Sequence, residues 1–181
     1  GKLVTDSPTL NSTQQSALSV LDQQLAAWDL TGLESTAKNL LVQGLSSDAV
    51  MVQLENSDAF KQRFSGNQQR VANGLSVLSP ADYISTEQAY DQVLRQYGVN
   101  GTFSNRDNFA KWIGNDVSAT ELQSRVQEGS DLVNETDPAA RQLLQQWYGI
   151  GDSDIMTTFL DPTQAQPLLD PRLFTNRRLS A

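Results

Sequence analysis

Two carboxylates four residues apart, Glu87 and Asp91, are the first residues in this sequence whose spacing suggests chemistry. On a helix this spacing places both side chains on one face, where they could act as a paired acid and base, as in glycoside hydrolysis. Glu121 is a further candidate acid. Paired catalytic carboxylates flank a substrate, however, and two side chains on the same helix define no cleft. We therefore interpret them as a solvated helix surface and predict no catalytic residues.

The segment Asp152-Ser153-Asp154 places two carboxylates where they could help to hold a cation. An EF-hand needs further oxygen ligands and a glycine at fixed steps, which this segment lacks, and acidic residues at a helix N-terminus explain it better. The chain has no His and no Cys, which excludes disulfides, thiol nucleophiles, His-based triads and the usual zinc sites. We predict neither a metal nor a cofactor.

Aromatic residues offer a different kind of site, one for binding rather than catalysis. Trp28, Tyr97, Trp112 and Trp147 lie at helical spacing beside aliphatic residues, which favours packing into a core. The alternative is that they anchor a protein interface. Basic residues near the C-terminus could contact an acidic protein surface or DNA. On the interface interpretation the candidate residues are Trp112, Tyr97, Trp147, Arg177 and Arg178.

Charge and hydropathy limit the classes of partner. The 13 Lys and Arg residues stand against 21 Asp and Glu, a formal net charge of −8. Nucleic acids and anionic membranes are themselves negative, so we predict no specific nucleic-acid partner. No apolar run approaches the roughly 20 residues that a membrane span requires, and we predict none. The 19 Gln residues, with many Asn and Ser, indicate polar faces suited to wet, reversible contacts with other proteins.

The elements that must position these residues are helices. Apolar residues recur at steps of three and four, as in Leu18, Leu21 and Leu25, and alternating strand-like runs are missing. Ser79-Pro80 places an N-cap before a proline at the first helical position, and Ser118 to Glu121 has the sequence of a capping box. We predict an all-α protein of eight to ten short and medium helices.

The sequence also contains an internal similarity. Residues 21–30 align with residues 90–99, sharing an Asp, a Gln, a Leu, an aromatic residue and a closing aliphatic residue in the same order. After a three-residue insertion, Leu45-Ser46 aligns with Val117-Ser118. We predict a degenerate two- to three-fold helical repeat, because such units bury their apolar stripes against one another. The expected organisation is a flexible lead-in (1–9), one helical domain (10–171) made of repeat one (about 10–66), repeat two (about 79–134) and a partial third (about 137–171), and a loose basic tail (172–181).

Two resemblances to known families attach to particular residues. A segment of about 30 residues resembles a short helical repeat of bacterial extracellular proteins, with the pattern G-L-x-x-W, then G-x-S-x-x-x-V, then S-x-E-F. The matching residues are Gly32, Leu33, Leu40, Gly44, Ser46, Val50, Leu54, Ser57 and Phe60. The Trp of that pattern is missing, and Ala59 replaces its Glu. Across most of the chain, segments such as FKQRFSGN (60–67), LSPADY (78–83) and WIGNDVS (112–118) resemble helical proteins from tailed phages of actinobacteria.

The phage resemblance implies a virion structural or minor tail component and carries over no catalytic residues. We therefore expect a non-enzymatic component of a tailed-phage virion that binds other virion or assembly proteins, with an oligomer possible. Two alternatives stay open. One is an extracellular binding or adhesion module of a bacterial surface protein, suggested by the residue 44–60 segment. The other is a carboxylate-dependent cell-wall hydrolase that uses Glu87 or Glu121 as its acid.

Overall fold

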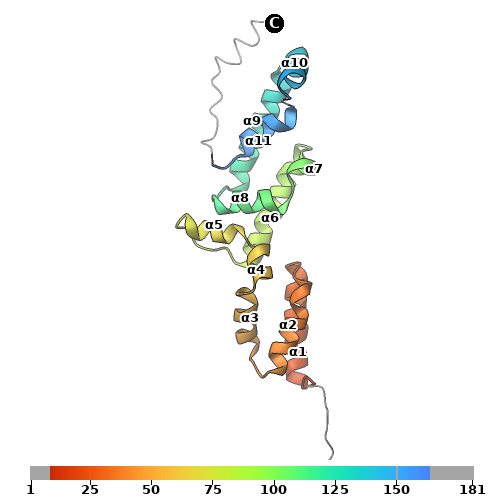
Figure 1. The fold of residues 1–181 in the computed structure, drawn as a ribbon, viewed down its shortest axis with the longest axis vertical. Coiled ribbons are helices and arrows are strands. Elements are labelled where there is room, and N and C mark those ends of the chain that lie inside the picture. The colour runs from red at the N-terminus through yellow and green to blue at the C-terminus, as the bar shows by residue number, and fades with distance from the viewer. Residues whose placement is uncertain (1–8, 150, 164–181) are drawn as a thin grey trace, which may run out of the picture. The chain divides into compact units, whose positions relative to one another are not determined.

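The chain is all-helical in the computed structural model, which describes residues 9–149 and 151–163, apart from the side chains of Leu144, Trp147 and Tyr148 (Figure 1). These residues form eleven α-helices and one 3-10 turn, with no strand among them. The predicted all-α class is therefore confirmed. The chain divides into two compact units, residues 1–65 and residues 66–181.

Unit 1 is built from a helical hairpin and the helices that follow it. Helix α1 (Ser12–Ala27) packs against α2 (Glu34–Val42) and α3 (Ser47–Glu55), and α2 packs against α3. The 3-10 turn η1 (Thr31–Leu33) joins the first two helices, and α4 (Asp58–Arg63) follows α3. Its buried apolar side chains are Leu21, Leu25, Leu30, Leu33, Ala37, Leu41, Val50, Leu54 and Phe64.

Side chains before α1, α3 and α4 satisfy free amides of the first turn, whereas α2 follows Leu33 without a side-chain cap. The side-chain Oδ1 of Asn11 accepts from the Gln14 backbone amide at 2.8 Å, and the Gln14 side chain accepts from the Asn11 backbone amide in return. Ser46 and Ser57 cap α3 and α4. Each cap replaces a hydrogen bond that the helix cannot make itself, which fixes where the helix begins.

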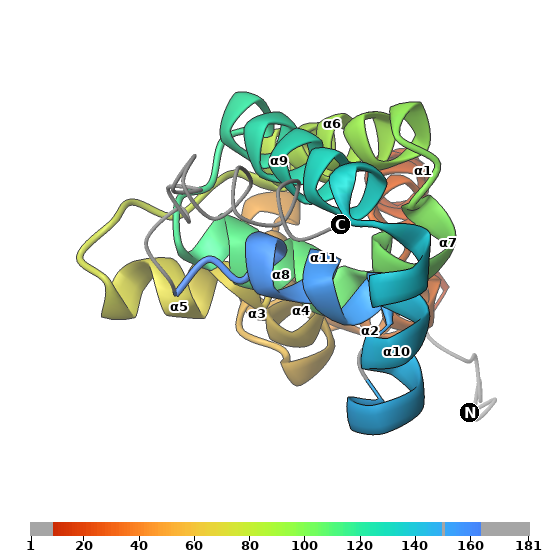
Figure 2. The ribbon, with the colours of Figure 1, turned by 90° about the horizontal axis from the view of Figure 1, so that it is seen from above.

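Unit 2 is larger and contains seven of the described helices. Helix α6 packs against α8 and α9, α5 against α8, and α11 against α9 (Figure 2). Their bounds are α5 Gly66–Ala72, α6 Pro80–Gln96, α7 Asn100–Phe103, α8 Arg106–Gly114, α9 Ala119–Glu135, α10 Pro138–Tyr148 and α11 Asp152–Leu160. The core of this unit therefore lies around α6, α8 and α9.

An aromatic cluster forms the centre of that core. The Trp112 ring meets Tyr90 edge-on, with centroids 5.4 Å apart, and Phe109 lies within 5.9 Å of both rings. The indole Nε1 of Trp112 donates to the Leu160 carbonyl at 2.8 Å, which ties the end of α11 to α8. Edge-to-face geometry matches the positive edge of one ring to the negative face of another, so these contacts orient the helices as well as burying area.

Several local predictions can be compared with this structure. Ser79 caps α6 and Pro80 occupies its first position, as predicted. Short helices α5 and α7 fall in segments without a helical apolar period, which is why the described helices exceed the predicted eight to ten. The Ser118 cap is present, but Glu121 turns its carboxylate to Arg125 rather than back to Ser118, so the predicted capping box is only half formed.

The aligned segments of the two units end their helices in the same way. Trp28 is the C-cap of α1 and is followed by Asp29 at φ 60°, while Tyr97 is the C-cap of α6 and is followed by Gly98 at φ 70°. In both cases the backbone amide of the second residue after the aromatic one donates to a carbonyl that lies five positions before that amide. This hydrogen bond is typical of a Schellman motif. The boundary between the units, at residues 65 and 66, lies at the expected end of repeat one. The repeat itself stays a prediction, as does the single domain over 10–171.

No helix within residues 9–149 and 151–163 has the length and apolarity that crossing a membrane requires. Residues 1–8, 150 and 164–181, which include the expected lead-in and basic tail, lie outside the described part of the chain.

Candidate functional site

Glu87 and Asp91, the paired carboxylates singled out by sequence, have different surroundings on α6. Glu87 is only 8% exposed, so the expectation that it belongs to a solvated surface is wrong for this residue: it lies on the side of α6 that turns inward. Asp91, one turn later, accepts hydrogen bonds from the Ser104 hydroxyl and from Arg95 Nε. The Ser104 hydrogen bond, followed by the Arg95 one, lowers the pKa of the Asp91 carboxyl below its usual range.

The third candidate acid, Glu121, forms an ion pair with a buried arginine. Its Oε1 lies 3.0 Å from Nη2 of Arg125, whose side chain is only 5% exposed. Nη1 of Arg125 donates to the carbonyls of Phe159 and Asp161 at the end of α11. Those carbonyls have no partner within their own helix, so Glu121 orients the group that satisfies them.

Acidic residues at the start of α11 have a similar structural role. The helix begins at Asp152, with Gly151 as its N-cap, so Ser153 and Asp154 lie in the first turn rather than before it. The Asp154 carboxylate accepts from the Gly151 amide at 2.7 Å. Among the described residues, no three carboxylates are grouped as metal ligands would be.

The five candidate interface residues have different outcomes. Trp112 is 2% exposed and belongs to the core, so its ring presents no surface to a partner. Tyr97 is half-buried at the end of α6. The side chain of Trp147, and both Arg177 and Arg178, lie outside the described part of the chain.

A groove of about 430 Å³ lies beside Arg70, between α6 and the start of α9. Arg70 donates to the carbonyls of Ser76 and Ile113 and forms an ion pair with Asp116 at 2.9 Å. Tyr90, also in its wall, donates to the Val117 carbonyl, and burial raises the pKa of its hydroxyl above the usual range. The groove's charged and phenolic groups are thus used within the fold, and we do not assign it a ligand.

A second cleft, of about 330 Å³, lies in unit 2 at Tyr97. Its apolar wall includes the buried side chains of Phe103 and Met156. Its polar lining comes from α7, the second half of α9 and the start of α11, and consists of Thr102, Ser130, Asn134, Asp152 and Ser153. The structure thus brings together Tyr97 and Asp152, two positions 55 residues apart that the sequence singled out for separate reasons.

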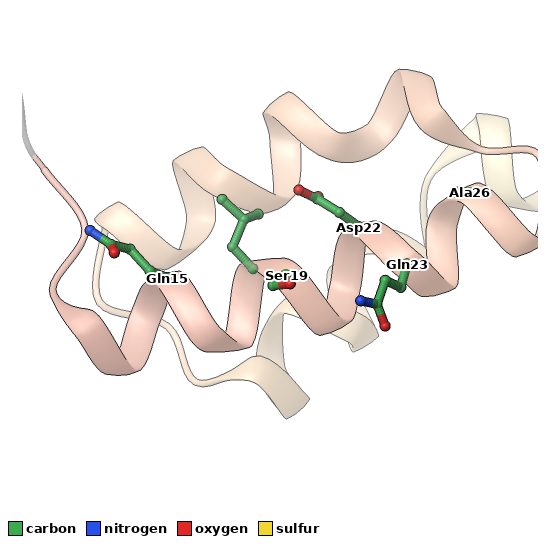
Figure 3. A pocket seen from close by; sticks show the side chains of 6 residues that line it. Gln15, Ser19, Asp22, Gln23 and Ala26 are labelled. Atoms are coloured by element: carbon green, nitrogen blue, oxygen red, sulfur yellow. The ribbon is translucent and has the colours of Figure 1, made fainter.

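The third concave surface lies along one face of α1 in unit 1, with a volume of about 460 Å³ (Figure 3). Figure 3 shows its residues following one another along the helix. The lining residues are Gln15, Leu18, Ser19, Asp22, Gln23 and Ala26. Most of them are exposed, whereas Leu18 and Asp22 are half-buried, so the face combines a polar rim with a small apolar strip.

Asp22 distinguishes this face from its counterpart in unit 2. Its Oδ1 is buried and, within the described residues, receives no hydrogen bond. The internal alignment pairs Asp22 with Asp91 and Ala26 with Arg95. Asp91 binds both Ser104 and Arg95, whereas α1 has an alanine where α6 has that arginine. The sequence alignment paired these residues, but it did not single out Asp22. The sign of its missing partner is that Ala26 stands at the position aligned with Arg95.

No protein-family model, curated protein or solved structure matches this chain.

Proposed function

We propose that this protein is a non-enzymatic structural component of a tailed-phage virion that binds other virion or assembly proteins. The observation that carries the protein-binding proposal is one face of α1, where Oδ1 of Asp22 receives no hydrogen bond from the described residues. The phage assignment rests on the sequence resemblance. The structural roles of Glu121 and Asp154 support a non-enzymatic protein, since these carboxylates are engaged in holding helix ends.

The chemistry of the α1 face selects a partner that presents a cation. A buried carboxylate oxygen without a donor costs about 1–3 kcal/mol, and a guanidinium can donate to both carboxylate oxygens at once. On this proposal the Asp22 side chain rotates on binding, so that Oδ1 meets the partner's cation. Leu18 and Ala26 flank Asp22 and would cover the aliphatic stem of an arginine.

The rim of the face fits a reversible contact. Its exposed side chains are the amides of Gln15 and Gln23 and the hydroxyl of Ser19. Such groups exchange hydrogen bonds with water for hydrogen bonds with a partner at little net cost in free energy. Interfaces of this composition are wet and polar at the edge, with few apolar anchors. That pattern suits subunits that associate during assembly, including further copies of the same chain.

Quantitative mass spectrometry of purified particles tests the virion proposal. We expect peptides of this chain at a fixed copy number relative to the major capsid protein, and the ratio would distinguish a capsid role from a tail role. Detection of the other structural proteins with complete absence of this chain would contradict it and favour an assembly factor or a surface module.

Charge reversal tests the role of α1. Asp22→Arg places a cation where we expect the partner's cation, so incorporation into particles should fall at least about tenfold, since like charges in a contact cost over 1.4 kcal/mol. Glu55→Arg is the matched control, because it makes the same charge change on an exposed residue of α3 in the same unit. Equal incorporation of both variants would reject the α1 face as the interface.

The extracellular binding module stays the alternative, and one local observation favours it. In the segment that resembles the bacterial repeat, the residues that match its pattern have local structural roles: Gly44 has φ 96°, Ser46 caps α3, and Val50 and Leu54 are buried. Binding of the intact chain to bacterial cells, with absence from particles, would favour this alternative.

A further inference from the structure

We propose that the cleft at Tyr97 binds a saccharide, as a terminal sugar or a short chain end. This goes beyond the proposed function and does not depend on it, because the cleft lies wholly in unit 2 whereas the α1 face lies in unit 1.

Tyr97 stands apart from the other Trp and Tyr residues whose side chains the structure describes. Trp28, Tyr90 and Trp112 each pack against other rings, and the Tyr83 hydroxyl accepts from the Gly66 amide. For Tyr97 there is neither a ring contact nor a side-chain hydrogen bond within the described residues. A half-buried ring left without partners at the mouth of a cleft offers a flat apolar face and a hydroxyl to a ligand.

The polar rim is likewise unused by the fold. Within the described part of the chain, the side chains of Thr102, Ser130, Asn134 and Ser153 make no hydrogen bond. Asp152 places Oδ2 3.5 Å from Nη1 of Arg141, which leaves Oδ1 for a ligand. The rim therefore presents hydroxyl, amide and carboxylate groups that both donate and accept.

This combination matches the two surfaces of a sugar ring. One face of a pyranose is lined by C–H groups and can lie on an aromatic ring, while its edge carries hydroxyls that need donors and acceptors. The cleft volume of about 330 Å³ lies at the lower end of the range for small-molecule sites, about 300–1,000 Å³. The size fits a single ring or a chain end better than a long polymer.

The lining favours a sugar over a peptide, and a neutral sugar over an anionic one. Recognition of a peptide uses a free strand edge, a deep apolar groove or an arginine cluster, and the cleft lining includes none of these. The Asp152 carboxylate would repel a carboxylated or sulfated sugar, whereas it can accept from the hydroxyls of a neutral one.

The test is a titration of the ¹⁵N-labelled full chain followed by NMR. The probes are glucose, galactose, mannose and N-acetylglucosamine, each as the monosaccharide and as a short oligomer. We expect amide shifts confined to the cleft residues, with a Kd of about 1 mM for the best probe. Tyr97→Ala should weaken that binding about tenfold or more, and Tyr97→Phe, which keeps the ring, should retain most of it.

Gln96→Ala is the matched control, since Gln96 is the exposed neighbour of Tyr97 on α6 and does not line the cleft. Its affinity for the sugar should equal that of the unchanged chain. The proposal is overturned if no probe shifts the cleft amides, or if Tyr97→Ala binds as tightly as the control. It is also overturned if these amides respond to a virion protein but to no sugar, which would make the cleft a protein-docking site. Failure here leaves the Asp22 experiment unaffected.

Discussion

At the scale of single residues, three arginines donate hydrogen bonds to carbonyls at the C-terminal ends of helices that are distant in the sequence. Nε of Arg63 donates to the Trp28 carbonyl, Nη1 of Arg70 to that of Ile113, and Nη1 of Arg125 to that of Phe159. The last carbonyls of a helix lack internal partners, and a cation there also interacts favourably with the helix dipole. These positive charges are therefore not free to bind a phosphate backbone, which supports the proposal of a protein partner.

Replacement of Trp112 tests the packing of unit 2. The ring is buried against Tyr90 and its indole donates to the Leu160 carbonyl. Trp112→Ala should lower the free energy of unfolding by about 3–5 kcal/mol, measured by urea denaturation followed by circular dichroism. A change below about 0.5 kcal/mol would show that the ring is not a core side chain.

The Asp91 carboxyl gives a prediction for pH. Its folded pKa is lowered, so its contribution to stability is complete above the unfolded value of about 3.9 and is lost as pH falls through the folded value. Ser104→Ala and Arg95→Gln should each raise this pKa toward the usual value, because each removes a group that favours the ionised carboxyl. Titration of the Asp91 carboxyl ¹³C shift measures both changes. An unchanged pKa in the Ser104→Ala variant would contradict the hydrogen bond as the first cause.

At the scale of helices, the contact between α5 and α8 depends on a glycine. A Cβ at Gly114 would lie 2.6 Å from Cβ of Gln69, so a side chain there forces the helices apart. Gly114→Ala should destabilise unit 2 by about 1–3 kcal/mol in thermal or urea unfolding, as overpacking does. Gly101→Ala, in α7 with open space around it, is the control and should be neutral or slightly stabilising. Equal effects would mean that α5 does not approach α8 closely.

The same contact shows what the sequence could and could not predict about the elements. Ser79-Pro80 and Ser46 specify helix starts through local capping, so these starts could be predicted from neighbouring residues alone. Helix α5 has no apolar stripe of its own: its residues are placed by Gly66, which lies against α8, and by Arg70, which reaches the end of α8. Such contacts join residues more than 40 positions apart, and no local pattern reports them.

The candidate sites, too, could be predicted from the sequence only in part. Tyr97 stood out in the sequence as an aromatic residue at the end of a helix, and Asp152 as an acidic one at the start of another, but their shared cleft arises from the packing of α11 on α9. Glu87 misled the sequence interpretation because a charged residue is usually exposed, whereas the register of α6 turns it inward. Asp22 is recognisable only by comparison with Asp91 and its partners.

At the scale of the whole molecule, each of the two units has its own buried core, although the sequence predicted a single domain over 10–171. Leu25 in unit 1 and Leu94 in unit 2 are both 0% exposed, and the internal alignment places them at the same position. They are therefore a matched pair of probes: each truncation to alanine leaves a cavity in one core and should cost about 2–5 kcal/mol there.

Hydrogen exchange measured for individual peptides would show which unit each truncation destabilises. If the units unfold separately, Leu25→Ala speeds exchange in α1 to α3 and leaves α6 and α9 unchanged, while Leu94→Ala does the reverse, because exchange follows the free energy of the local unfolding unit. If either variant speeds exchange equally in both units, the chain is one cooperative domain, as the sequence predicted. The separate result would mean that the α1 face and the Tyr97 cleft belong to independently folding parts, so that one chain could hold a protein through one unit and a sugar through the other.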